Sequence, residues 1–420
     1  MSKYSDLYNY IKKEITTNQI AYGGKLPSIR KASELFGVSR TTVQSAYFDL
    51  AADGFIMSEP KSGYYVSYKP TKKQNKTASK KSQNNIIYDF TSDRADKESF
   101  DFNLWRRYIK SALRQDERLL SYSESQGEIE LREALSDYIR ENRNVNSSAD
   151  RIVVGAGVQN LLGVLCSLID DKDNVSFPDK SFIQGISIFE DYGFNISYRN
   201  KNARIIYVSP SHMTRFGDVM PNKRRAELVK HSAQNKSLVI EDDYESDFLY
   251  NSRPTPSLHA LSGGSNVIYI GSFSKLLLPS IRISFMVLTE ELAEKYKNNI
   301  HKYNQTASKT EQIALCQFIR DGHLKSQIRK TRRFYTTKTK SFAELLTKEF
   351  KEANVEISEN ALQIKLSIPF NKSTDVFKEH GLSVFIESYE NGILKLVLNT
   401  SSIQTSEFQN AINSLKKAIF

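Results

Sequence analysis

One short stretch limits most strongly how this chain can fold. Residues 69–85 read KPTKKQNKTASKKSQNN and contain no aromatic and no large aliphatic residue. Such a segment cannot bury enough apolar surface to offset the entropy lost on ordering it, so we interpret 69–86 as a flexible basic linker. The chain therefore divides into a short N-terminal part, residues 1–68, and a long C-terminal part, residues 87–420.

Positive charge is concentrated in the first part and the linker. Residues 1–86 hold fourteen Lys and Arg against six Asp and Glu, a surplus of eight in a chain whose net charge is +11. A basic head on a nearly neutral body predicts that the head binds a polyanion. The alternative is a solvated basic surface followed by a lysine-rich linker.

The remaining composition is typical of a globular protein, with 39% hydrophobic and 25% charged residues. Cys166 and Cys316 lie in apolar runs without the spacing of a zinc site, so we expect two reduced, buried thiols and no metal. Apolar stretches fall well short of the roughly twenty residues that a membrane span needs. The first residues do not resemble a signal peptide, so we expect a cytoplasmic protein without a membrane partner.

The head predicts three helices and a hairpin. Apolar spacing indicates a first helix over 4–17, and Ser28 and Ser39 are suited to cap a second and a third helix. Residues 55–68 then read as a hairpin, which completes a winged helix-turn-helix. The side chains expected to turn inward are Leu7, Tyr10, Ile11 and Ile15 in the first helix and Ile29, Ala32, Leu35 and Phe36 in the second.

The third helix carries polar side chains suited to the major groove at its N-terminal end. Residues 26–56, LPSIRKASELFGVSRTTVQSAYFDLAADGFI, resemble the head of GntR-type bacterial repressors. This resemblance implies binding of double-stranded DNA, although a winged helix used only for protein contacts is the alternative. The implied contacts are Arg30, Ser39, Arg40, Thr41, Gln44, Lys61 and Gly63. Arg30 and Lys61 are suited to phosphates, and Arg40 and Gln44 to base edges.

The body alternates short apolar runs with helical segments, which predicts an α/β fold with a mostly parallel sheet between helices. In such sheets ligands bind at the carboxyl ends of strands. One such end, Gly155-Ala156-Gly157, leads into a helix whose first amides, those of Val158 and Gln159, would hold a phosphate. It does not fit a dinucleotide fingerprint, because the third glycine is misplaced.

Two further strand ends carry reactive side chains. Residues 240–246, IEDDYES, could hold a metal, pair with a pyridinium nitrogen, or form only a solvated strand end. Residues 271–286, GSFSKLLLPSIRISFM, combine two hydroxyls and Arg282, which suit a phosphate, with Lys275, which suits imine formation with an aldehyde.

These motifs in this order resemble a fold-type I aminotransferase, and the GntR-like head joined to such a body is similar to the MocR/GabR-type regulators. The resemblance implies pyridoxal 5'-phosphate (PLP) as cofactor, with Lys275 as its Schiff-base lysine. It places Asp242 at the ring nitrogen, Tyr244 at the ring oxygen and Phe182 against the ring face. The implied phosphate contacts are Val158, Gln159, Ser272, Ser274 and Arg282. A large subdomain of about 87–290 and a small one of about 291–420 are also implied.

Two departures from the family pattern bear on the effector. The loop PSHMTRFGDVMP, residues 210–221, differs from the usual PSHQFPTG-like sequence, and it contains Arg215. In GILKLVLNT, Lys395 stands where aminotransferases have an arginine that binds the substrate carboxylate, and lysine lacks the bidentate fork. We therefore take Lys395 and Arg215 as candidate effector contacts.

The family resemblance predicts a transcriptional regulator rather than an enzyme. Its body would sense PLP or a small amine or amino acid, and a homodimer with heads swapped across the bodies would read paired half-sites. The first alternative is a regulator whose body no longer binds PLP and serves dimerisation or another ligand. The second is a working aminotransferase with an accessory DNA-binding domain.

Overall fold

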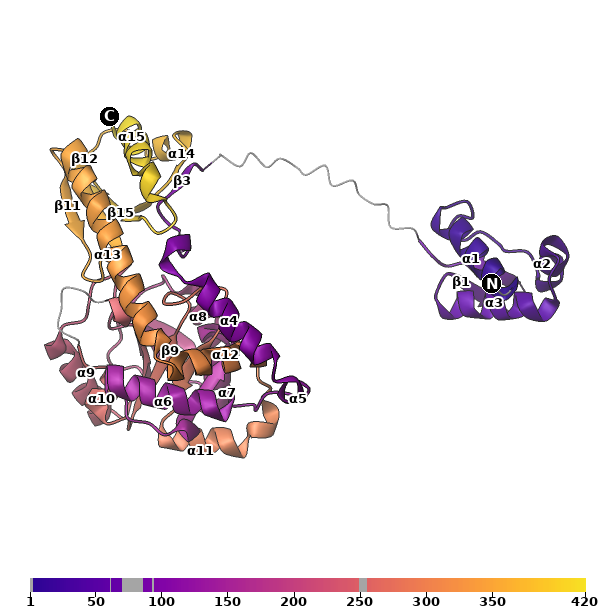
Figure 1. Cartoon of the computed structure of the whole chain (residues 1–420), viewed down its shortest axis with the longest axis horizontal. Coiled ribbons are helices and arrows are strands. Elements are labelled where there is room, and N and C mark those ends of the chain that lie inside the picture. The colour runs from indigo at the N-terminus through magenta and orange to yellow at the C-terminus, as the bar shows by residue number, and fades with distance from the viewer. Residues whose placement is uncertain (1–2, 61, 70–85, 93, 249–254) are drawn as a thin grey trace. The chain divides into compact units, whose positions relative to one another are not determined.

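The computed structural model describes residues 3–60, 62–69, 86–92, 94–248 and 255–420. The chain forms two compact units, Met1–Gln83 and Asn84–Phe420 (Figure 1). Each unit has hydrophobic cores of its own.

The first unit is the winged helix-turn-helix expected from the sequence. Its helices are α1 (Lys3–Thr16), α2 (Ile29–Phe36) and α3 (Arg40–Ala52), followed by the antiparallel strands β1 (Ile56–Glu59) and β2 (Gly63–Val66). Leu7 and Ile11 of α1 and Val43, Tyr47 and Leu50 of α3 fill the core between the helices. The core of the head is therefore built from residues of the first unit.

Capping residues fix where α2 and α3 begin and where α2 ends. Ser28 Oγ accepts a hydrogen bond from the Lys31 amide at 3.3 Å, and Ser39 Oγ accepts one from the Thr42 amide at 3.1 Å. Gly37 ends α2 with a φ of 61°, a left-handed conformation that glycine adopts at low cost. Both predicted caps are confirmed.

Two of the predicted inward residues of the head face solvent instead. Tyr10 is 52% exposed and Leu35 is 66% exposed. Leu35 lies off the face that Ile29, Ala32 and Phe36 share, because α2 is only eight residues long and its buried stripe is narrow. Tyr10 lies at the edge of the α1 stripe, and its ring meets Phe36 edge-on with centroids 5.6 Å apart.

A seven-stranded sheet forms the centre of the second unit. Its strands are β4 (Ile152–Gly155), β5 (Asn174–Phe177), β6 (Asn195–Tyr198), β7 (Ile205–Val208), β8 (Leu238–Asp242), β9 (Val267–Ser272) and β10 (Ser284–Val287). The order is β4-β10-β9-β8-β7-β5-β6, with only β10 antiparallel to its neighbours. Ser284 of β10 pairs with both Gly155 and Ser272, so the carboxyl ends of β4 and β9 lie level.

Helices cover both faces of this sheet. The covering helices are α4 (Phe102–Leu113), α5 (Asp116–Leu119), α6 (Ile129–Arg143), α7 (Val158–Leu168), α8 (Ile183–Asp191), α9 (Asn222–Gln234), α10 (Leu258–Ser262), α11 (Glu290–Asn298) and α12 (Lys309–Arg320). One core packs α4, α6 and α12 against the sheet, and another packs α7, α8 and α11 against it. The fold is thus the α/β architecture that the sequence predicts.

A smaller antiparallel sheet follows the long helix α13 (His323–Glu349), which Figure 1 shows running from the large sheet to the C-terminal strands. Its strands, in the order β11-β12-β15-β14, are β11 (Asn354–Ile357), β12 (Gln363–Pro369), β15 (Ile393–Asn399) and β14 (Phe385–Glu390). The helices α14 (Val376–Glu379) and α15 (Phe408–Ile419) belong to the same part. The short strand β3 (Tyr88–Asp89) pairs in parallel with β13 (Leu382–Ser383).

The packing places the start of the small part later than residue 290. Leu292 of α11 and Phe318 of α12 lie in the cores of the large sheet. Helix α13 belongs to both parts, because Ile328 packs with the large sheet and Phe342 with the small one. Phe90 also packs in the small core although it lies near the start of the body. Among the helices of the described ranges, none is long and apolar enough to cross a membrane.

We predict that Ser39→Ala lowers the stability of the head by about 1 kcal/mol, because the Thr42 amide loses its cap acceptor. In a unit of this size that corresponds to a fall of about 4–8 °C in melting temperature. Amide hydrogen exchange of α3 in the full chain measures the effect. Ser45→Ala, at an exposed position inside α3, is the control and should change little. Equal protection of α3 in all three proteins would contradict the cap assignment.

Candidate functional site

The ends of two adjacent parallel strands bring Asp242 and Lys275 to one edge of the large sheet. Strand β8 ends at Asp242 and pairs with β9, where Asp242 lies opposite Ile270. Lys275 follows β9 by three residues and is only 9% exposed. A buried lysine and a carboxylate thus stand at neighbouring strand ends, where ligands bind in sheets of this kind.

Asp242 belongs to a small aromatic cluster. The Tyr207 hydroxyl, from the end of β7, donates to Asp242 Oδ2 at 2.6 Å, and the ring of Phe182 stacks on Tyr207 with centroids 5.4 Å apart. Burial raises the pKa of the Asp242 carboxyl to about 6, although the bond from Tyr207 acts in the opposite direction. An aromatic wall and a carboxyl of raised pKa therefore lie together.

A set of anion-binding groups lies where β4 and β9 end at the same edge of the sheet. Gly157 has a φ of 95°, and a Cβ atom at this position would stand 2.7 Å from Nη2 of Arg282. Helix α7 begins at Val158 with no side-chain cap, so its first amides open toward this turn. Ser272 Oγ and Ser274 Oγ lie 3.3 Å apart. A guanidinium, two hydroxyls and a helix N-terminus form a donor set that fits a phosphate.

Glu245 connects Lys275 to the small sheet. One of its oxygens, Oε1, lies 3.9 Å from Lys275 Nζ. The other, Oε2, lies 2.9 Å from His212 Nδ1 and accepts a hydrogen bond from Asn360 Nδ2 at 2.8 Å. The His212 ring also meets the Tyr244 ring edge-on at 5.4 Å. Glu245 is thus held by residues from three separate segments.

The backbone and the charge of Glu245 are both unusual. Its φ is 61°, a left-handed conformation that non-glycine residues rarely adopt and that costs strain unless the surroundings enforce it. Burial alone would raise the pKa of its carboxyl, but His212 and Lys275 reverse this and hold that pKa below its usual value. Glu245 therefore stays charged beside Lys275.

A small cavity of about 100 Å³ opens beside this cluster. It is lined by Phe90, Thr91, His212, Arg215, Tyr244, Glu245, Gln363, Val397 and Asn399. The Arg215 guanidinium lies 4.6 Å from the centroid of the Phe385 ring. Lys395 is exposed and does not line the cavity; Val397 and Asn399 of its strand do. Of the two candidate effector contacts, Arg215 thus lines this cavity and Lys395 does not.

The carboxylates next to Asp242 are held by other partners. The amides of Leu258 and His259 donate to Glu241 at 2.8 and 2.9 Å. Arg143 forms two bonds to Asp243, at 2.6 and 2.9 Å, and the Tyr269 hydroxyl donates to Asp243 at 2.6 Å. Neither of these two carboxylates is placed as a metal ligand, because protein donors already occupy them.

The candidate DNA contacts of the head differ in whether their side chains already bind other residues. Arg40, Thr41 and Gln44 are exposed on α3. Arg30 lies 3.3 Å from Glu34 as an exposed ion pair, and Gly63 begins β2 with a φ of 114°. Ser39 is used as a helix cap. Lys61 lies outside the described residues.

Sequence reasoning missed Tyr207, His212 and Glu245 as site residues. Tyr207 lies within the run RIIYVSP, one residue before β7 ends, and a polar ring near the carboxyl end of an apolar strand was a usable signal. Glu245 stands within IEDDYES, but its main partner, Asn360, is 115 residues away in the chain, so no local pattern links the two.

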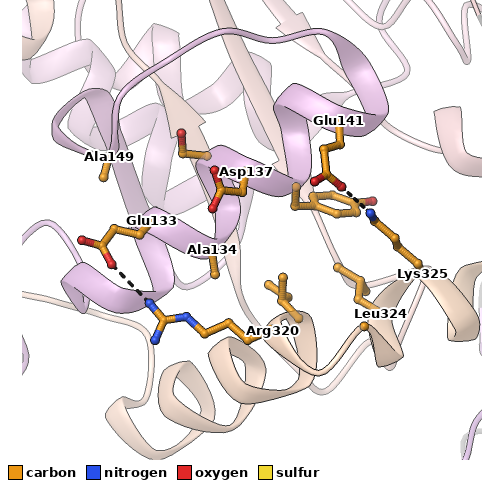
Figure 2. A pocket seen from close by; sticks show the side chains of 12 residues that line it. Glu133, Ala134, Asp137, Glu141, Ala149, Arg320, Leu324 and Lys325 are labelled. Atoms are coloured by element: carbon orange, nitrogen blue, oxygen red, sulfur yellow. Dashed lines mark hydrogen bonds and ion pairs between the residues drawn. The ribbon is translucent and has the colours of Figure 1, made fainter.

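A larger cavity of about 590 Å³ lies between α6 and the junction of α12 and α13 (Figure 2). Arg320 pairs with Glu133 across it at 3.2 Å, and Lys325 pairs with Glu141. The third acidic side chain of the lining, Asp137, pairs with Arg140 of α6, so all three acids already have basic partners and the cavity offers a ligand no set of unpaired charges.

Comparisons with known proteins match both units. The family described as bacterial regulatory proteins, gntR family, matches residues 3–66, and aminotransferase class I and II matches residues 94–379. The uncharacterized HTH-type transcriptional regulator YdeL of Bacillus subtilis (strain 168) is 30% identical over 99% of this chain and 96% of its own length. The probable rhizopine catabolism regulatory protein MocR of Rhizobium meliloti is 26% identical over 89% of this chain and 82% of its own.

Solved structures agree on the fold of the body. The crystal structure of an archaeal alanine:glyoxylate aminotransferase superposes with a TM-score of 0.68 at 20% identity, covering 79% of this chain and 90% of that one. At this identity the likeness concerns the fold alone.

We predict that Asp242→Asn stabilises the cofactor-free chain at pH 7.5. Because the folded-state pKa of Asp242 is raised to about 6 from 3.8, the folded chain holds this proton more tightly than the unfolded one. Its stability therefore falls as the pH rises from about 4 through 6. The amide removes a cost of roughly 1–3 kcal/mol above pH 6 and little at pH 4.

Urea unfolding of the variant and the natural chain at both pH values measures this difference. The exposed Asp171→Asn serves as a control in which neither pH should reveal a change. A variant of Asp242 that is destabilised equally at pH 4 and 7.5 would show that burial does not govern this carboxyl.

Proposed function

Because the chain belongs to the MocR-type HTH transcriptional regulators, in which a GntR head is joined to an aminotransferase class I/II domain, we propose that its body binds PLP on Lys275 and that a small amine or amino acid at this site changes DNA binding by the head. The observation that carries this proposal is the meeting of Lys275, Asp242 and the Arg282 donor set at one sheet edge.

Each chemical part of PLP has a matching group in the described site. The phosphate would be held by Arg282, Ser272, Ser274 and the first amides of α7, from Val158 and Gln159. The Asp242 carboxyl would pair with the ring nitrogen, and Phe182 with Tyr207 would form the aromatic wall, while Tyr244 would donate to the ring oxygen. The turn at Gly157 supports this assignment, because a side chain there would collide with Arg282. Bound PLP would supply an aldehyde that condenses with amines.

The effector would occupy the cavity beside Glu245. Arg215 is the guanidinium among its lining residues and would take an anionic group of the effector. We no longer assign this contact to Lys395, since the cavity is lined instead by Val397 and Asn399. Strand β15 contributes the apolar Val397, and no arginine, to the wall of this cavity. We therefore propose that the body senses a ligand and does not sustain amino transfer.

The cavity borders the segment that follows the linker. Phe90 and Thr91 line it directly. The Asn399 amide donates to the Phe90 carbonyl at 2.8 Å, and Thr91 Oγ1 lies 3.0 Å from Ser383 Oγ. An effector that binds better to one arrangement of these contacts would shift the body toward that arrangement, and the linker ends just before them in the chain.

A homodimer with swapped heads completes the proposal. Leu120 is 89% exposed and Tyr122 is fully exposed, both in the loop before α6. Large apolar side chains in such positions are typical of interaction surfaces, so they support contact with a second copy. Two heads on one dimer would read paired half-sites in double-stranded DNA.

We predict that Lys275→Ala keeps DNA binding but abolishes its response to PLP and amines, because the variant has no amine to hold the cofactor. The probe is a duplex that the natural chain selects from a random-sequence library, and its affinity is measured with and without PLP and a panel of amines. Lys297→Ala, an exposed lysine of α11, is the matched control and should respond normally. A response that survives in Lys275→Ala would rule out sensing through this lysine.

We predict that Arg40→Ala with Gln44→Ala relaxes sequence discrimination by the head, at about 1–3 kcal/mol for each base interaction that the change removes. Arg30→Ala should instead weaken binding equally on selected and scrambled duplexes, because a phosphate contact carries no sequence information. Competition between the two duplexes separates these effects. Unchanged discrimination in the α3 variant would overturn its assignment as the reading helix.

A further inference from the structure

The first three-quarters of α13 carries one sign of charge. Residues 323–343 contain seven Lys and Arg and no Asp or Glu, and the first acid of the helix is Glu344. Helices on protein surfaces normally intersperse both signs, because neighbouring like charges one turn apart repel. The excess of positive charge therefore needs an explanation outside the helix itself.

Part of this charge is neutralised within the body. Lys325 pairs with Glu141, as Figure 2 shows, and Lys338 pairs with Asp96. Arg329, Lys330 and Arg333 are exposed, and none of them has an ion pair or hydrogen bond with another described residue. These three exposed cations lie within little more than one turn of the helix.

These cations line a groove of about 570 Å³ along α13. The lining residues of the helix form two rows in which successive members are four residues apart. The first row is Arg329, Arg333, Thr337 and Ser341, and the second is Lys330, Phe334 and Lys338. Thr405 and Glu98, the latter in the 3-10 turn Lys97–Ser99, also line the groove.

All four side chains of the first row can donate hydrogen bonds, and all are of kinds that contact phosphate oxygens. Twelve residues of helix separate Arg329 from Ser341, which is about 18 Å at a rise of 1.5 Å per residue. Donors spread along a line of this length fit an extended polyanion, whereas a single phosphate would require donors that converge on one point.

We propose that this groove binds the phosphodiester backbone of duplex DNA, as a contact of the body that is independent of sequence. The inference takes from the proposed function only that this chain meets DNA. Glu98 is the one carboxylate among the lining residues, so the groove remains cationic overall. Such a contact would add affinity and salt dependence without adding sequence discrimination.

The test is the triple variant Arg329→Gln, Lys330→Gln, Arg333→Gln in the full chain, measured on selected and scrambled duplexes over a series of salt concentrations. We expect binding to weaken roughly tenfold or more at low salt, equally on both duplexes. The slope of log affinity against log salt should become shallower by up to about 3 per protomer, because each phosphate interaction that is removed accounts for about 1. Discrimination between the duplexes should not change, which separates this result from a failure of the head.

The matched control is Lys223→Gln, Arg224→Gln, Lys230→Gln on α9, which removes the same charge from exposed residues that do not line the groove. An equal effect in both triple variants would mean that only net charge matters, and the proposal would be overturned. Glu98→Gln supplies the opposite test, since removing the carboxylate from the groove should tighten binding to both duplexes. Unchanged affinity in both Glu98→Gln and the α13 variant would also overturn it.

Discussion

The carboxyl end of β8 sets the constraint on which the rest of the body depends. Glu241, Asp242, Asp243 and Glu245 follow one another within five residues, and burial of a carboxylate without a partner is costly. Each therefore has partners of its own. Backbone amides of α10 bind Glu241, Tyr207 binds Asp242, Arg143 and Tyr269 bind Asp243, and His212 with Asn360 binds Glu245.

These partners divide the carboxylates by function. Alternate side chains of an extended strand point to opposite faces, so Glu241 and Asp243 bind structural partners on one face. Asp242 is left on the other face, beside the aromatic wall. Glu245, beyond the strand, links Lys275 to the small sheet through Asn360. The same strand end thus builds the proposed cofactor site and connects it to the segment next to the linker.

Local patterns predicted the elements of this chain better than its long-range contacts. The caps at Ser28 and Ser39 and the alternation of strands and helices follow from neighbouring residues, and both are confirmed. Lys395 was harder to place because Lys395, Val397 and Asn399 share a face of β15. Which of them lines the cavity depends on the point along β15 at which the rest of the fold packs against it. The role of Glu245 depends on Asn360, and the subdomain boundary depends on how α13 crosses two cores.

The central claim is that this strand end holds PLP on Lys275. The visible absorbance spectrum of the full chain purified with added PLP, beside that of Lys275→Ala, tests it most directly. The account predicts an absorbance band of protein-bound PLP in the natural chain that is absent from the variant. If both proteins showed only the spectrum of free PLP, the body would not be a cofactor site, and its ligand would have to be sought among molecules other than amines.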